Sequence, residues 1–265
     1  MFNMNSTPRL ANVSFESNFS DSFGGGMANI CLSSARLDNV TFVSNLANGN
    51  GGGMYCDDSS PILTNVTYLM NSARVGGGMY NSLGSNGSLT NVAFLGNIAD
   101  RNGGGLAIDD ISNPLLTNVI LSGNSADRGG GISVRSSSSP TLVNITFSGN
   151  STTSRGGGLF VQEDSIPVVS NSIFWGNKSG GFNDQISNND MAPGTPILNN
   201  CLVQGGCPDT HTTCNTVIDA DLTCSPKTGP CKMLESLVNQ EVRHEDEASP
   251  RGADYSDVAG SGAWG

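Results

Sequence analysis

The chain has 265 residues, of which only 13% are charged and 35 are glycine, and its formal net charge at pH 7 is −11. This acidic balance argues against nucleic acid as a partner, because Lys and Arg drive phosphate binding. No apolar run approaches the roughly 18 residues of a membrane span, and the N-terminus has no apolar signal-peptide segment. The length allows one elongated domain or two small compact ones.

A repeat runs through most of the chain. In one copy its fixed positions are Leu63, Asn65, Val66, Tyr68 and Asn71, and the other copies keep the same spacing. The period is about 26 residues, a length that is typical of solenoid proteins. The first asparagine of the motif recurs as Asn12, Asn39, Asn65, Asn91, Asn118, Asn144 and Asn171.

Each repeat predicts three short strands. The apolar residues one and three positions after the first asparagine alternate with polar ones, as in a strand with one buried face. The asparagine itself interrupts the alternation, and asparagine tolerates the left-handed conformation that a sharp bend needs. Because one repeat cannot bury its apolar residues alone, we expect a single-stranded parallel β-helix of seven to eight coils, an all-β fold. Stacked asparagine side chains would satisfy one another's hydrogen bonds.

Glycine triplets precede the second alternating run of each repeat. We expect them to be architectural, since the returning backbone passes close to the next coil and needs positive φ. A phosphate-binding role is not expected, because no Gly-x-x-x-x-Gly-Lys pattern occurs. Two such triplets are Gly51, Gly52 and Gly53, and Gly103, Gly104 and Gly105.

The first residues already align with the interior of a repeat, Met1 with Met54 and Asn12 with Asn65. An unfinished coil exposes an open strand edge, which solenoids normally cap. We therefore expect that further coils precede residue 1 and that the chain is a fragment, so its start says nothing of export.

The paired motifs Gly51–Met54 with Tyr68–Asn71 and Gly129–Ile132 with Phe147–Asn150 resemble the repeats of polymorphic outer membrane proteins. They are also similar to bacterial secreted proteins described as right-handed parallel β-helix or choice-of-anchor proteins. The resemblance covers about residues 1–207. It implies a right-handed helix and an extracellular or cell-surface location. Autotransport is not implied, because the triplet alanine and the C-terminal membrane barrel of the polymorphic proteins are missing.

Parallel β-helices of the pectate-lyase-like superfamily also include polysaccharide lyases and glycoside hydrolases. The candidate catalytic residues here are Asp57 and Asp109, which occupy equivalent positions two coils apart, about 10 Å by coil spacing. That separation lies near the upper end of the range for an inverting carboxylate pair, and the same aspartates could also bind calcium. No basic residue is expected beside them, and solvated turn residues are the simpler interpretation. No other metal or cofactor is expected.

A second candidate site is a stripe of arginines that recurs once in each repeat, just before the glycines. The stripe would form a basic ladder along one edge and contact an anionic polysaccharide or a cell-surface glycan. A solvated loop edge with local ion pairs is the alternative. Its members are Arg74, Arg101, Arg128 and Arg155.

The period is lost after Gly206. Five of the seven cysteines lie between Cys201 and Cys231, with little histidine, so we expect disulfides of an oxidising compartment rather than zinc. The predicted organisation is a β-helix over 1–207, a Cys-rich cap over 208–232, and a short helix with a disordered acidic tail over 233–265.

Our main hypothesis is a non-catalytic extracellular or cell-surface β-helix with a structural or adhesive role. The alternatives are a polysaccharide lyase or hydrolase that uses Asp57 or Asp109, and a glycan-binding module without turnover. An aspartate-to-alanine series on a panel of glycans would separate them.

Overall fold

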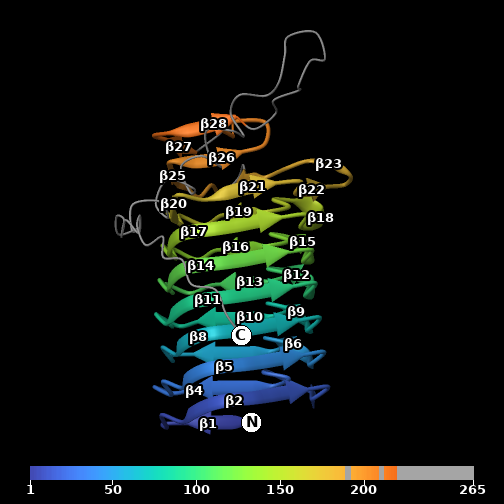
Figure 1. Cartoon of the computed structure of the whole chain (residues 1–265), viewed down its shortest axis with the longest axis vertical. Helices are drawn as coiled ribbons and strands as arrows, with labels where there is room; N and C mark the ends of the chain where they lie inside the picture. Colours follow the sequence, from blue (N-terminus) through green and yellow to red (C-terminus); the bar gives the residue numbers. More distant parts are fainter. Residues whose placement is uncertain (189–191, 209–211, 220–265) are drawn as a thin grey trace, which may run out of the picture. The chain divides into compact units, whose positions relative to one another are not determined.

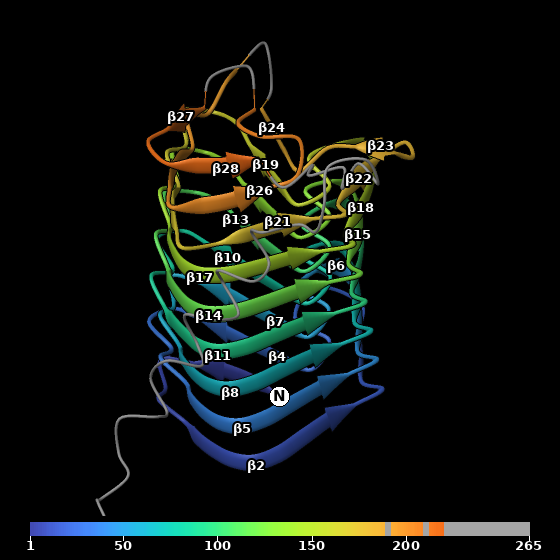
Figure 2. The same ribbon diagram turned by 45° about the horizontal axis from the view of Figure 1, so that its top comes forward.

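The computed structural model of the chain describes residues 1–188, 192–208 and 212–219. The chain winds as a parallel β-solenoid, and equivalent strands of successive coils pair in three sheets (Figures 1 and 2). The predicted all-β solenoid is thereby confirmed.

Sheet A contains eight short strands. Alternate residues of these strands face the core, as Met54 and Cys56 do in β7, while Tyr55 lies on the opposite face. In order, the strands are β1 (Phe2–Met4), β4 (Met27–Ile30), β7 (Met54–Asp57), β10 (Met79–Ser82), β13 (Leu106–Ile108), β16 (Ile132–Val134), β19 (Leu159–Val161) and β24 (Ile186–Asn188).

Sheet B contains the long strands, which begin as β2 (Arg9–Glu16), β5 (Arg36–Val43), β8 (Ile62–Leu69), β11 (Ser88–Leu95), β14 (Leu115–Ser122) and β17 (Thr141–Ser148). Beyond β17 each coil contributes two shorter strands. These are β20 (Val168–Ser170) with β21 (Ile173–Trp175), β25 (Ile197–Asn199) with β26 (Cys201–Val203), and β27 (Thr213–Cys214) with β28 (Val217–Asp219).

Sheet C closes each coil. Its strands are β3 (Phe19–Ser20), β6 (Leu46–Asn50), β9 (Ser72–Val75), β12 (Ile98–Asn102), β15 (Ser125–Arg128), β18 (Ser151–Arg155), β22 (Lys178–Ser179) and β23 (Phe182–Asn183). Every pair of strands in the three sheets is parallel except β22–β23. Parallel pairing follows from the repeat, since each strand meets its own copy one coil later.

The core consists of columns of identical or similar side chains. Leu63 pairs in register with Leu89, and Val66 with Val92. The aromatic rings of Tyr68 and Phe94 stack at 4.7 Å between centroids and are fully buried. Such offset stacks add to the free energy of apolar burial.

The first asparagine of each motif lies at a bend in sheet B. Asn39, Asn65 and Asn91 have φ of 53°, 55° and 55°, and their side chains are exposed. Non-glycine residues rarely occupy this region, and asparagine is among those that do so most often. The same positive φ occurs at Asn12, Asn118, Asn144 and Asn171.

The second asparagine of the motif, at the turn from sheet B to sheet C, is buried in every coil from Asn45 to Asn177, and only Asn18 of the first coil is exposed. The Asn97 Nδ2 donates to Asn124 Oδ1 and to the Tyr68 carbonyl, both at 2.9 Å. Its Oδ1 accepts from the Asn71 backbone N–H and side chain at 3.0 Å. The pattern recurs from coil to coil, so this ladder lies inside the solenoid while the first series lies outside.

The glycine triplets lie where sheet C turns into sheet A. Gly51 and Gly103 have φ of 70° and 67°. A Cβ at Gly53 would lie 2.7 Å from both the Gly78 carbonyl oxygen and the Tyr68 ring. A Cβ would likewise meet a carbonyl oxygen of the next coil at Gly52, Gly104 and Gly105.

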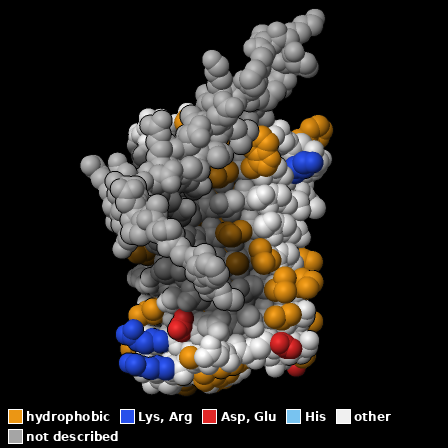
Figure 3. Space-filling view, in the orientation of Figure 1, with side chains coloured by type: hydrophobic (Ala, Val, Ile, Leu, Met, Phe, Trp, Pro, Cys, Tyr) orange, Lys and Arg blue, Asp and Glu red, His pale blue; other side chains and the backbone are white. Residues whose placement is uncertain are grey.

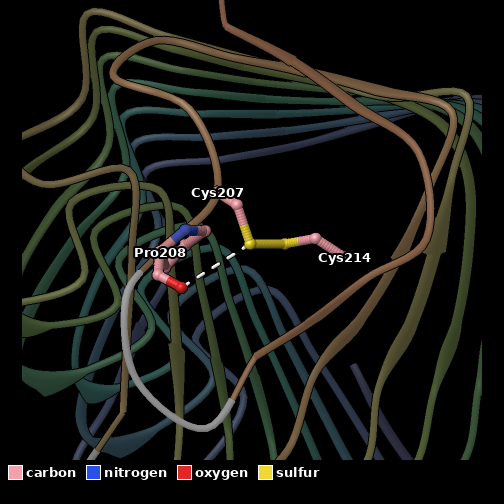
Figure 4. The surroundings of a disulfide bond; sticks show 3 residues. All are labelled: Cys207, Pro208 and Cys214. Carbon is pink, nitrogen blue, oxygen red and sulfur yellow. Dashed lines mark hydrogen bonds between the residues drawn. A yellow bond between two sulfur atoms is a disulfide. The ribbon is translucent and has the colours of Figure 1, made fainter.

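The stack continues past the predicted boundary at residue 207. β27 pairs with β25 and β28 with β26, all parallel. A disulfide joins Cys207 to Cys214, with 6.2 Å between the Cα atoms (Figure 4). One disulfide of the Cys-rich segment is thus present. The rest of the predicted cap, and the helix and tail of 233–265, lie outside the described residues.

Candidate functional site

The two candidate aspartates lie at the C-terminal end of sheet A. Asp57 ends β7 and pairs in register with Ser82. Asp109 follows β13, and because Ile108 pairs with both Asn81 and Val134, the next outward residue along the column is Arg135. The column therefore runs Asp57, Ser82, Asp109, Arg135, with one coil between the two aspartates.

Asp109 is paired with a basic residue, contrary to the expectation from the sequence. The Arg135 guanidinium donates to Asp109 Oδ2, and Asp109 is only 4% exposed. Asp109 Oδ1 also accepts from the Asp110 backbone N–H at 3.1 Å. Burial is the largest single influence and acts to lower the pKa of Arg135, but the hydrogen bond to Asp109 and the negative charges of Asp109 and Glu163 together raise the pKa above its usual value. Arg135 follows Asp109 by one repeat period, so the period was the signal that could have found it.

Asp57 has a different partner. The Tyr55 hydroxyl donates to Asp57 Oδ2 at 3.0 Å. Burial chiefly, and then this hydrogen bond, raise the pKa of Tyr55 above its usual value. Both aspartates therefore have protein partners, Arg135 of the next coil for Asp109 and Tyr55 of the same strand for Asp57.

The arginine stripe is divided rather than continuous. Asn102 pairs with Val75 on one side and with Arg128 on the other, and Arg128 pairs with Arg155. Arg74 and Arg101 precede these positions at a bulge, so they do not continue the Arg128 column. The reason is that the coil from Asn102 to Arg128 is shorter than the coils on either side of it, which shifts the register by one.

The members of the stripe also have local partners. Arg128 lies 3.6 Å from Asp127 and 5.9 Å from the centroid of the Phe160 ring. An Arg155 Nη donates to the Asn188 carbonyl at 3.1 Å. Arg74 and Arg101 are exposed. Of the two interpretations from the sequence, a solvated loop edge with local contacts therefore fits this region better than a continuous ladder of arginines.

A depression with both apolar and charged lining lies on the outer face of sheet B, where the sequence analysis named no site. It has a volume of about 510 Å³. Arg9 and Arg36 stand on one side and Asp38 and Asn65 on the other. Figure 3 shows Lys and Arg side chains gathered at the lower left of the view, at the end of the solenoid where β2 and β5 lie.

Metal and membrane features are not found in the described part of the chain. Residues 1–188, 192–208 and 212–219 contain no group of three or more His, Cys, Asp or Glu side chains placed to hold a metal ion. Over the same residues there is no helix long and apolar enough to cross a membrane.

The arrangement of three parallel sheets around one core agrees with the comparison with known families. The model of the right-handed β-helix region matches residues 76–219, more than half of the chain. The chain belongs to this right-handed β-helix family. The match extends to the last described strand, β28, and so includes the coil that the sequence analysis did not foresee. No curated protein and no solved structure matches the chain.

Proposed function

We propose that this right-handed β-helix is a non-catalytic scaffold with a structural or adhesive role outside the cell or at its surface. The observation that carries the proposal is the continuous buried amide ladder. Each asparagine donates to the next coil and accepts from the previous one, so the coils are fixed to each other along the solenoid. Such a rigid stack of coils could present its outer sheet faces to other molecules at the cell surface.

The chemistry of the candidate aspartates supports the same proposal. A general acid or base needs a carboxyl group that can reach a substrate proton. Asp109 is buried and paired with Arg135, and Asp57 accepts from Tyr55. The Asp109–Arg135 contact joins neighbouring coils, whereas the Asp57–Tyr55 contact lies within strand β7.

The location is supported by two features. The Cys207–Cys214 disulfide is typical of chains that fold in an oxidising compartment. The repeats also resemble those of polymorphic outer membrane proteins and choice-of-anchor secreted proteins, which are surface or exported proteins.

Two experiments test the proposal. Antibodies against residues 1–219 should label intact cells that produce the chain, and mild external proteolysis should remove the label. Labelling only after lysis would contradict the location.

The second experiment incubates the purified chain with uronate and neutral glycans, with and without calcium. No turnover is expected. Turnover that disappears in Asp57→Ala or Asp109→Ala would instead establish the polysaccharide lyase or hydrolase.

A further inference from the structure

Three aliphatic side chains at the corner between sheets A and B are exposed on a strained backbone. Leu32, Leu83 and Ile111 have φ of 62°, 51° and 61°, and they are 70%, 57% and 65% exposed. The left-handed region disfavours residues with a Cβ, and a bulky or β-branched residue there is an outlier. Apolar burial does not offset this strain, because most of each side chain lies in solvent.

Other coils place better-suited residues at the position of Ile111. The backbone N–H groups of Gly84, Ile111 and Ser137 each donate to a carbonyl at the corner of the next coil, at 2.9, 3.0 and 2.8 Å. The three residues are therefore equivalent, and all have positive φ. Glycine adopts this conformation without steric cost. Strain that packing does not explain is a reason to look for a function on the exposed side.

Leu83 and Ile111 belong to neighbouring coils and line one depression on this corner. Its volume is about 600 Å³. Residues with no side chain or a short one leave the space between the two aliphatic groups open, namely Gly84, Ser136 and Ser137. The depression can therefore accept apolar side chains from outside.

The same corner is acidic. Asp58 and Asp110 lie on the coils before and after Leu83, and Glu163 and Asp164 follow two coils beyond Asp110. In the corner segments between residues 31 and 167 the one basic residue is Arg135, which is bonded to Asp109. Within the described residues neither Asp58 nor Asp110 forms an ion pair.

This combination of groups selects the chemistry of the partner. Exposed aliphatic side chains are complementary to other apolar groups, and the carboxylates beside them attract Lys and Arg. An anionic lipid surface or an acidic polymer would be repelled. The same corner of a second copy would also be repelled, because it carries the same charges.

We propose that the corner formed by Leu32, Asp58, Leu83, Asp110 and Ile111 binds a basic amphipathic segment of a partner protein. Aliphatic side chains of the partner enter the depression between Leu83 and Ile111, and its Lys or Arg side chains contact Asp58 and Asp110. This inference rests on the proposed adhesive role and gives it a protein partner.

The test measures fluorescence anisotropy of a labelled synthetic peptide with leucines on one face of a helix and lysines on the other. Two comparison peptides replace all lysines by glutamate or all leucines by serine. Only the first peptide is expected to bind. Binding should weaken as salt is added, since the contacts between exposed charges are screened.

Ile111→Asn separates a binding role from a structural one. Asparagine tolerates the left-handed conformation, so the urea midpoint of unfolding should rise. Binding of the Lys/Leu peptide should weaken about fivefold, because an apolar contact is lost. A lower urea midpoint with unchanged binding would show that Ile111 serves the fold and would overturn the proposal.

Asp110→Asn tests the charge, and Ile98→Asn is the matched control. Asp110→Asn keeps the shape and should reduce the salt dependence of binding. Ile98 is 52% exposed at the start of β12, away from this corner, and its φ is not positive. Its substitution should leave binding unchanged. Equal losses in Ile98→Asn and Ile111→Asn would show unspecific apolar attraction and contradict the site.

The remaining outcomes also decide. Absence of binding by the Lys/Leu peptide, or equal binding by the glutamate peptide, would refute the site. Neutral phosphatidylcholine vesicles that bind through Ile111 while the peptide does not would identify a lipid surface instead. Surface labelling and the turnover assay do not depend on the peptide, so failure here leaves the proposed location and the absence of catalysis to be judged by their own tests.

Discussion

Asn97 and Asn81 are both fully buried, yet their side chains differ in hydrogen bonding. The Asn97 amide makes four bonds to neighbouring coils. The Asn81 side chain faces the core between Cys56 and Ile108, and within the described residues neither of its amide atoms has a partner. Burial of an unpaired polar group costs about 1–3 kcal/mol.

The two asparagines should therefore respond oppositely to the same substitution. Asn97→Val removes all four bonds and should lower the free energy of unfolding by about 3 kcal/mol or more. Asn81→Val removes an unsatisfied amide and should raise it by about 1 kcal/mol. Urea unfolding followed by circular dichroism measures both. Destabilisation of similar size in the two variants would show that Asn81 is satisfied in solution.

Gly53 gives a prediction about the crowded turn between sheets C and A. Gly53→Ala would press a Cβ against the Gly78 carbonyl oxygen and the Tyr68 ring, and should cost about 3 kcal/mol. Gly123 has φ of 64° but open space around it, so Gly123→Ala should cost only about 1–2 kcal/mol of backbone strain. Thermal unfolding compares the pair. A larger loss for Gly123→Ala would mean that conformation, and not close approach, selects the triplets.

At the scale of the strands, the periodicity of the sequence predicts which side chains face the core. It gives no prediction for segments that do not repeat. Leu63, Val66 and Tyr68 face the core because their spacing repeats in every coil, and parallel stacking converts that repeat into columns. β27 and β28 were not predicted, since strands of two and three residues are too short to show alternation. Their pairing is specified by β25 and β26 instead.

The candidate site was predictable only in part, because sequence position does not give the contact partner. The repeat places Asp57 and Asp109 on one column, but the pairing of Asp109 with Arg135 needs the register of β13 on β16. The prediction of a continuous arginine column was wrong for the same reason. A one-residue difference in coil length moves Arg101 out of the column that contains Arg128. Arg9 and Arg36 share one position of the repeat and pair in register, but the depression beside them depends on how the side chains of β2, β5 and β8 fill the surface, which the repeat does not show.

Strand β7 carries a titratable group into the core and gives a prediction about pH. Cys56 is fully buried, and burial raises the pKa of its thiol to about 12 from 9.0. Below pH 9 the thiol is neutral in both states, so its contribution to stability is complete. Between pH 9 and 12 only the unfolded chain loses the proton, so stability falls as the pH rises.

Cys56→Val should therefore reduce the loss of stability between pH 8 and pH 10, relative to the unaltered chain. Urea midpoints at the two pH values measure it. A thiol reagent at pH 8 provides the control, since exposed Cys31 should react in the folded chain and Cys56 should not. An unchanged pH dependence in Cys56→Val would assign the alkaline loss to the buried tyrosines.

At the scale of the whole solenoid, each coil contacts its two neighbours and the core is a stack, not a sphere. In such repeat proteins stability is close to a sum of coil and interface terms, and damage remains local. Phe94 and Phe174 are suitable probes, because both are fully buried and belong to different parts of the aromatic column. Phe94 stacks on Tyr68, and Phe174 stacks on Phe147 at 4.3 Å.

Phe94→Ala and Phe174→Ala should each cost about 3–5 kcal/mol of local stability. Amide hydrogen exchange should show the loss of protection in β8, β11 and β14 for the first variant. For the second it should appear in β17, β21 and β26, with little change elsewhere. A uniform loss of protection across all strands in both variants would contradict local coupling. It would mean that the coils unfold as one cooperative unit, as in a compact domain with a single core.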